Sequence, residues 1–225
     1  MPITTKDQNL VTKYYSTKSK QDFNKRRKLQ KHIYLVESIS EKIIDLYSAK
    51  SIDRKISTIE IASIKYACLF HDVGKTVEWK LDGDDLHIEK GKQIITSEEF
   101  ERNFREISID LFSETEIDQI IAYVVSAIEL HQSIELNNEG YLSSFVSAIV
   151  YASDKIAHIN KSKDFDKRKE AYSKTKKQID RLFKKIHAKY ECDDNWKVLI
   201  FCISQVLKNE KPSQKDTWTI FDEKQ

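Results

Sequence analysis

The chain has 225 residues, of which 40% are hydrophobic and 33% are charged, with 38 basic and 36 acidic side chains. This hydrophobic content can fill one sizeable core, so the composition excludes a disordered or a fibrous protein. Only four glycines and two prolines are present. An all-β or doubly wound protein needs more turn residues than this, and the sequence therefore predicts an all-α fold of long helices with short connections.

The cysteines and the hydropathy limit the cellular compartments in which the protein is expected. Cys68, Cys192 and Cys202 are an odd number without CxxC spacing, so they indicate neither a disulfide framework nor a thiolate zinc site. No apolar run approaches the roughly 20 residues of a membrane span, and the N-terminus does not resemble a signal peptide. We therefore expect a soluble cytoplasmic protein with no membrane partner.

The charges are segregated along the chain. Residues 1–31 carry nine Lys and Arg against two acidic residues, and residues 161–190 carry twelve against four, so these flanks have net charges of +7 and +8. Residues 32–160 have a net charge of −11. An acidic centre suits divalent cations, whereas basic flanks suit a polyanion such as nucleic acid. Acidic residues interrupt the second basic run, so the alternative of a merely solvated lysine-rich helix stays open.

Hydrophobic periodicity predicts a first long helix over residues 23–47. Val36, Ile39 and Ile43 recur there at helical spacing. His32 lies four residues before Val36 on the same apolar stripe, so we expect its side chain to face the core.

A second helix is predicted after Ser57, which can cap it. This helix runs into His71 and Asp72, and Gly74 ends it. Within residues 77–89, two short alternating stretches flank an Asp-Gly dipeptide, a pattern compatible with a short β-hairpin.

Two further helices are expected in the middle of the chain. One begins within residues 87–89 and reaches Phe104. The other opens at Ser113, which forms a capping box with Glu116, and its apolar stripe continues to His131.

The last predicted helices contain one unusual position. A helix from Tyr141 carries Val150 and, four residues later, Asp154, where the stripe would otherwise have an apolar side chain. Burying this carboxylate without a partner would be costly. Two more helices are predicted over residues 164–190 and 194–208.

Histidine and aspartate thus recur on the buried faces of separate helices. A single histidine on an apolar stripe is usually a hydrogen-bonded core residue. Several independent elements with such residues favour one shared metal site, because imidazole and carboxylate groups lose their hydration only where a cation or another charge compensates. The residues concerned are His32, His71, Asp72, His131 and Asp154.

Taken in order, the motifs are His32, His71-Asp72-Val-Gly-Lys75, His87-Ile-Glu-Lys-Gly, Ile-Glu-Leu-His131 and Ala-Ser-Asp154-Lys. This order resembles the HD superfamily of metal-dependent phosphohydrolases over about residues 25–160. The resemblance implies an HD-type helical bundle, in which residues 1–225 form one domain and residues 161–225 form a basic helical extension.

The resemblance also implies a ligand set. One divalent metal ion would be bound by His32, His71, Asp72 and Asp154. A second ion beside it would be bound by His87 and His131, although the hairpin alternative would leave His87 as a strand or surface residue. Histidine-rich ligands fit Fe, Mn, Co, Ni or Zn better than Mg.

Asp72 and Lys75 are the catalytic residues that the resemblance implies. Lys75 would contact a substrate phosphate, and a solvated lysine at a helix end is the alternative. His158 follows Asp154 by one turn and could reach the same pocket, but a hydrogen-bonded structural role is the more common one for such a residue. His187 lies in the basic segment, and we expect it to be exposed.

The expected function is hydrolysis of a phosphoester or phosphoanhydride bond in a small nucleotide or short nucleotide messenger by metal-activated water. His131 is followed by Gln132 rather than by a second histidine, as in the subgroup that includes symmetrical dinucleoside tetraphosphate hydrolases. No Gly-Tyr-Pro motif follows, which disfavours the cyclic-di-GMP branch. The alternatives are a CRISPR-type nuclease that binds single strands through the basic flanks, and a non-catalytic regulatory HD domain.

Overall fold

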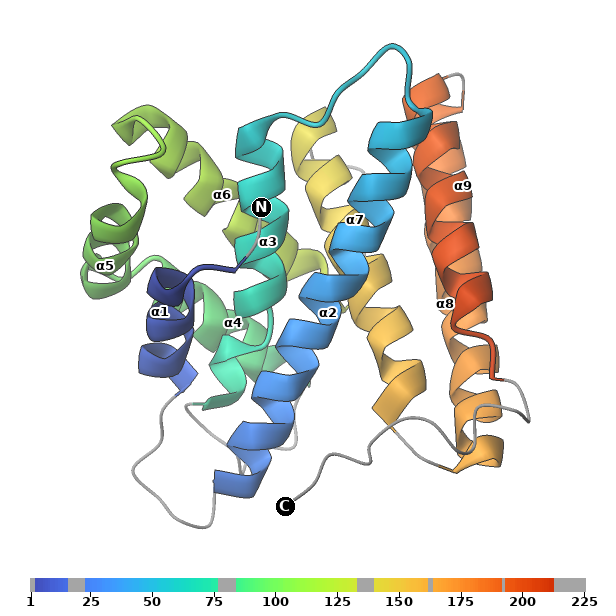
Figure 1. Ribbon diagram of the computed structural model, residues 1–225, viewed down its shortest axis with the longest axis horizontal. Helices are drawn as coiled ribbons and strands as arrows, with labels where there is room; N and C mark the ends of the chain where they lie inside the picture. Colours follow the sequence, from blue (N-terminus) through green and yellow to red (C-terminus); the bar gives the residue numbers. More distant parts are fainter. Residues whose placement is uncertain are drawn as a thin grey trace.

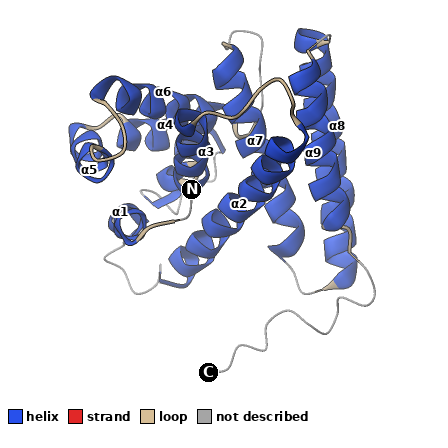
Figure 2. Cartoon of the chain, turned by 45° about the horizontal axis from the view of Figure 1, so that its top comes forward, coloured by secondary structure: helices blue, strands red, loops and turns tan. Residues whose placement is uncertain are grey.

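The computed structural model describes residues 3–15, 23–76, 84–132, 140–161, 164–191 and 193–212. Over these residues the secondary structure is entirely helical, which confirms the predicted all-α fold (Figures 1 and 2). The elements are α1 (Thr5–Tyr15), α2 (Phe23–Lys50), α3 (Thr58–Phe70), the 3-10 helix η2 (Val73–Thr76), α4 (Asp84–Ile95), α5 (Glu98–Ser108), α6 (Glu114–Leu130), α7 (Tyr141–Ala157), the 3-10 helix η3 (His158–Lys161), α8 (Phe165–Tyr190) and α9 (Asp194–Asn209).

Helix α3 lies at the centre of the fold and packs against α2, α6 and α7 (Figure 1). Every residue from Ala62 to Phe70 is buried, and most of these residues are apolar. A helix that is apolar around its whole circumference is stable only when neighbours cover all of its faces. The carboxyl end of α3, which leads into His71 and Asp72, is therefore held inside the protein.

Two capping boxes fix where the central helices begin. The Ser57 side chain accepts the Glu60 N–H and the Glu60 carboxylate accepts the Ser57 N–H, and Ser113 and Glu116 repeat this exchange at α6. Each box satisfies backbone donors that the first helical turn leaves without partners. Both predicted helix starts are confirmed.

The N-terminal helix α1 is fastened to α3 by buried polar contacts. Asp7 accepts hydrogen bonds from Lys65 Nζ and from the Tyr66 hydroxyl, each at 2.7 Å. The Tyr15 hydroxyl donates to the Leu69 carbonyl at 2.7 Å. Because Leu69 lies two residues before His71, α1 supports the turn that carries the His-Asp pair.

Two predictions around α4 are wrong. The single helix expected to reach Phe104 is two helices, since the Ser97 side chain accepts the Phe100 N–H and starts α5 anew. The second arm of the β-hairpin is also wrong, because α4 is already helical from Asp84. The first arm falls on residues 77–83, which lie outside the described residues.

The two C-terminal helices form as predicted. In Figure 1, α8 and α9 run side by side along one edge of the molecule, and α9 packs against α2. Trp196 of α9 is fully buried, and its ring stacks on Tyr190 with 4.5 Å between ring centres. None of the described helices is long and apolar enough to cross a membrane.

Candidate metal centre

Four buried side chains from three parts of the fold meet at one point. His32 on α2 has its Nε2 atom 3.0 Å from Asp154 Oδ1 and 3.9 Å from Asp72 Oδ2. His71, at the end of α3, has its Nε2 atom 3.5 Å from Asp72 Oδ2 and 3.6 Å from Asp154 Oδ1. The structure therefore brings together the four residues that the sequence predicts for a first metal position.

A second group lies on the other side of Asp72. His131 Nε2, at the end of α6, is 3.6 Å from Asp72 Oδ1, and His87 Nε2 on α4 is 3.8 Å from the same oxygen. The Gln132 side-chain nitrogen lies 3.0 Å from His87 Nε2. Asp72 thus links two groups, with Oδ2 toward the first and Oδ1 toward the second. The donor atoms of His32, His71 and Asp72 lie near enough to share one ion, and so do those of Asp72, His87 and His131.

The imidazole contacts indicate which nitrogen faces the site. Nδ1 of His71 lies 2.8 Å from the Cys68 carbonyl, and Nδ1 of His131 contacts the Ile128 carbonyl. Because a carbonyl oxygen only accepts, each Nδ1 carries the proton, and the neutral ring presents the lone pair of Nε2.

The surroundings of two Nε2 atoms, those of His71 and His131, indicate whether a cation fits between the predicted ligands. Both atoms are buried and make no hydrogen bond within the described part of the chain. Their carboxylate neighbours lie 3.5 to 3.6 Å away, too far for a good hydrogen bond. Ligand atoms that surround one ion at about 2.1 Å are about 3.0 to 4.2 Å apart, so these buried groups could hold a metal ion.

The carboxylates of the site are ionised. Burial alone would raise the pKa of Asp72 and Asp154, but the histidines outweigh it and hold both pKa values well below the usual range. Burial lowers the pKa of His71, yet the charges of Asp72 and Asp154 outweigh it and raise this pKa. The two carboxylates therefore favour the protonated ring of His71, and a metal ion that binds its Nε2 has to displace a proton.

We expect the affinity for a divalent metal to fall as the pH is lowered. The raised pKa of His71 means that protons compete with the metal near neutral pH. Each displaced proton changes the affinity about tenfold per pH unit. Calorimetric titration with Co²⁺ between about pH 6 and 8, in buffers of different ionisation enthalpy, measures the affinity and the protons released. An affinity independent of pH would contradict this competition.

Gly74 allows α4 to approach η2. A Cβ atom at this position would lie 1.8 Å from the His87 carbonyl oxygen and 2.6 Å from the Gly91 nitrogen. Both are backbone atoms of α4, so neither can move without the helix. Only glycine therefore permits the contact that places His87 beside Asp72.

Gly74→Ala is expected to push α4 away and to remove His87 from the second group. Overpacking of this kind costs about 1–3 kcal/mol of unfolding free energy or more. Thermal unfolding and the number of Co²⁺ ions bound per chain measure the two effects. Gly91→Ala is the matched control, since its Cβ would lie 3.3 Å from the Ile128 side chain and in ordinary contact with Gly74 N at 3.6 Å and the Val73 side chain at 3.8 Å. Wild-type stability with unchanged Co²⁺ binding in Gly74→Ala would show that this approach is unnecessary.

Each carboxylate of the site also has a lysine. Lys75 Nζ lies 2.7 Å from Asp72 Oδ1, and Lys155 Nζ lies 2.9 Å from Asp154 Oδ2. The Lys75 side chain is 39% exposed, so its ammonium group can be reached from solvent. The HD resemblance implies a catalytic role for Lys75 but not for Lys155.

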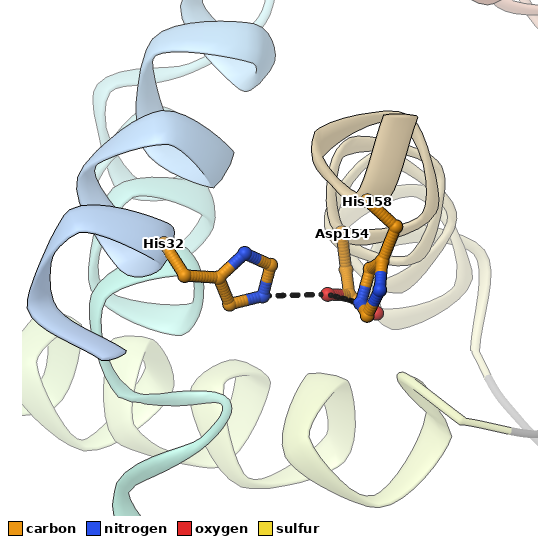
Figure 3. Close-up of side chains that lie close together, drawn as sticks. All are labelled: His32, Asp154 and His158. Atoms are coloured by element: carbon orange, nitrogen blue, oxygen red, sulfur yellow. Dashed lines mark hydrogen bonds and ion pairs between the residues drawn. The ribbon is translucent and has the colours of Figure 1, made fainter. Parts of the chain in front are cut away.

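His158 reaches the site, as its spacing from Asp154 allows, and its contact with Asp154 is also compatible with the predicted hydrogen-bonded role. Its Nε2 atom is 3.1 Å from Asp154 Oδ1, and its ring centre is 5.1 Å from that of His32 (Figure 3). The available signal was the spacing of four residues from Asp154, which places both on one helix face. His187 is exposed on α8, as expected.

Comparison of the chain with family models, curated proteins and solved structures found no match. A proposal for the function therefore depends on the order of the motifs and on the geometry of the His/Asp site.

Proposed function

We propose that this protein is an HD-type metal-dependent phosphohydrolase that cleaves a phosphoester or phosphoanhydride bond in a small nucleotide or short nucleotide messenger. The observation that carries the proposal is Asp72, whose two oxygens face two separate histidine groups. One carboxylate shared between two neighbouring cation positions suits phosphoryl transfer, in which attacking and leaving oxygens both need stabilisation.

The donor set suits divalent transition metals. A bound cation of this kind lowers the pKa of its water ligand toward neutrality and draws charge from phosphoryl oxygens. The ionised Asp72 and Asp154 supply negative charge, and the imidazole groups supply nitrogen. We propose Fe, Mn, Co, Ni or Zn rather than Mg, which prefers oxygen ligands.

Lys75 is the residue best placed to meet a substrate phosphate. Its ammonium group lies beside Asp72 at the second group, and its side chain reaches solvent. There it can compensate the negative charge that develops on a phosphoryl group. Lys155, by contrast, is largely buried against Asp154.

Incubation of the Co²⁺-loaded or Mn²⁺-loaded protein with nucleoside phosphates, dinucleoside polyphosphates and cyclic dinucleotides tests the proposal. We expect metal-dependent release of phosphate or mononucleotide from at least one of these classes. A His187→Gln variant, which changes an exposed histidine outside the site, should have the activity of the wild type. A metal-loaded protein that binds nucleotides without cleaving any of them would favour the non-catalytic regulatory alternative.

The exposed face of α8 supports a second candidate, a single-strand nuclease. This face carries the exposed basic residues Lys174, Lys176, Lys177, Arg181 and Lys184. Helix α8 also touches the end of α7 that bears the site, because the Thr175 hydroxyl donates to the Lys155 carbonyl at 3.0 Å.

Single-stranded DNA belongs in the same substrate panel. We expect cleavage confined to small nucleotides, because the net charge of −11 over residues 32–160 repels a long polyanion. Efficient DNA degradation at physiological salt, lost when Lys176, Lys177 and Lys184 are changed to glutamate, would favour the nuclease instead. The affinity of such a nuclease for DNA would fall steeply with salt concentration, because each phosphate contacted releases about 0.7 counterions.

A further inference from the structure

Three imidazole groups converge on a single oxygen atom. Asp154 Oδ1 lies 3.0 Å from Nε2 of His32, 3.1 Å from Nε2 of His158 and 3.6 Å from Nε2 of His71. A carboxylate oxygen has two lone pairs, which the closer His32 and His158 can occupy, so the buried Nε2 of His71 at 3.6 Å is left without a hydrogen bond. Figure 3 shows His32 reaching Asp154 from α2, while His158 lies beside Asp154 at the end of α7.

The distances match neighbouring ligands of one ion. Two atoms that each lie about 2.1 Å from a six-coordinate cation are about 3.0 Å apart when adjacent and about 4.2 Å apart when opposite. The separations of His32 and His158 from Asp154 Oδ1 are therefore those of adjacent ligands. The donor atoms of His32, Asp154 and His158 all lie within 4.8 Å of one another.

The helix positions His158 at the solvent side of this group. It follows Asp154 by four residues and caps the carboxyl end of α7, so both side chains project from one face. The His158 side chain is 43% exposed, whereas His32, His71, Asp72 and Asp154 are buried. His158 therefore closes the open side of a buried ligand set.

From this convergence we infer that His158 is a fifth protein ligand of the first metal position, which His32, His71, Asp72 and Asp154 share. The inference rests on the proposed function, because it requires that this position holds a divalent cation. It adds one ligand to the four that the HD resemblance implies. A six-coordinate ion would keep one place for water or a phosphate oxygen.

The added imidazole makes the two positions unequal. The first position has three nitrogen donors and two ionised carboxylates, which favours Fe, Co, Ni or Zn over Mg. The second has His87, His131 and one oxygen of Asp72, and the Lys75 ammonium group competes for that same oxygen at 2.7 Å. The protein should therefore bind its first metal ion tightly and its second weakly.

The test compares His158→Gln with the wild type in titrations of metal-depleted protein with Co²⁺. Glutamine keeps an N–H that can donate to Asp154 but offers no imidazole nitrogen. We expect the affinity of the tight position to fall about 100-fold and the visible absorption of bound Co²⁺ to change, because a nitrogen ligand is lost. His187→Gln, an exposed histidine of α8, should bind as the wild type does.

The outcomes separate this inference from the proposed function. A His158→Gln protein whose bound Co²⁺ keeps the wild-type absorption spectrum would show that His158 only orients Asp154 and would overturn the inference, because loss of an orienting partner lowers metal affinity about 10–100-fold without changing the ligand set. A wild-type chain that binds no Co²⁺ would overturn the proposed function as well. Thermal unfolding of the metal-free proteins checks that the variant folds, as the exposure of His158 leads us to expect.

Discussion

Replacement of Asp72 by asparagine is expected to abolish hydrolysis and to empty both metal positions. Asp72 is buried and ionised, and its two oxygens face different histidine groups. An amide has no negative charge and only one oxygen, so neither group would keep its shared anionic ligand. We expect turnover to fall by about 10³-fold or more, which corresponds to about 4 kcal/mol of transition-state stabilisation.

The matched control for this change is Asp180→Asn, which alters an exposed carboxylate on α8. It should leave both turnover and metal content unchanged. Metal analysis of the purified proteins and initial rates on the best nucleotide of the panel measure the two effects. An Asp72→Asn protein with full metal content and wild-type turnover would refute the central role of Asp72.

Removal of metal is expected to lower the melting temperature by about 5–15 °C. A ligand present at 100 to 1,000 times its dissociation constant stabilises the folded state by about 2.7 to 4.1 kcal/mol. For a chain of this length, each kcal/mol shifts the melting temperature by about 2–4 °C. In the metal-free protein the buried Asp72 and Asp154 depend on neighbouring histidine and lysine side chains to compensate their charges.

Calorimetric scans with and without excess chelator measure this shift. The chelator should have no effect on Asp72→Asn, since that variant binds no metal to remove. An unchanged transition of the wild-type protein, after metal loading has been verified, would indicate that the histidines form a hydrogen-bonded core instead.

Sequence patterns predicted most of the fold because its signals are local. The capping boxes at Ser57 and Ser113 lie within four residues each, and the apolar stripes that carry His32 and Asp154 repeat at helical spacing. Periodicity also predicts that such side chains face inward. Periodicity therefore predicts one shared site for the inward-facing histidines and aspartates, and the HD resemblance implies which four of them form the first metal position.

The remainder depends on contacts between elements distant in sequence. The position of His87 follows from the approach of α4 to Gly74, and the alternation in residues 77–89 suggested a strand instead. The reach of His158 toward Asp154 Oδ1 depends on its side-chain direction at the end of α7. Spacing indicates a shared face, but it does not distinguish a ligand from a hydrogen-bonded core histidine.

The most direct measurement of the central claim is a metal titration of the depleted protein with turnover followed at every step. We expect no hydrolysis of the best nucleotide without metal, tight binding of a first Co²⁺ or Mn²⁺ ion, and turnover that rises with the occupancy of the site formed around Asp72. Full turnover by protein shown to contain no metal, or saturated metal binding with no turnover on any nucleotide, would contradict this claim.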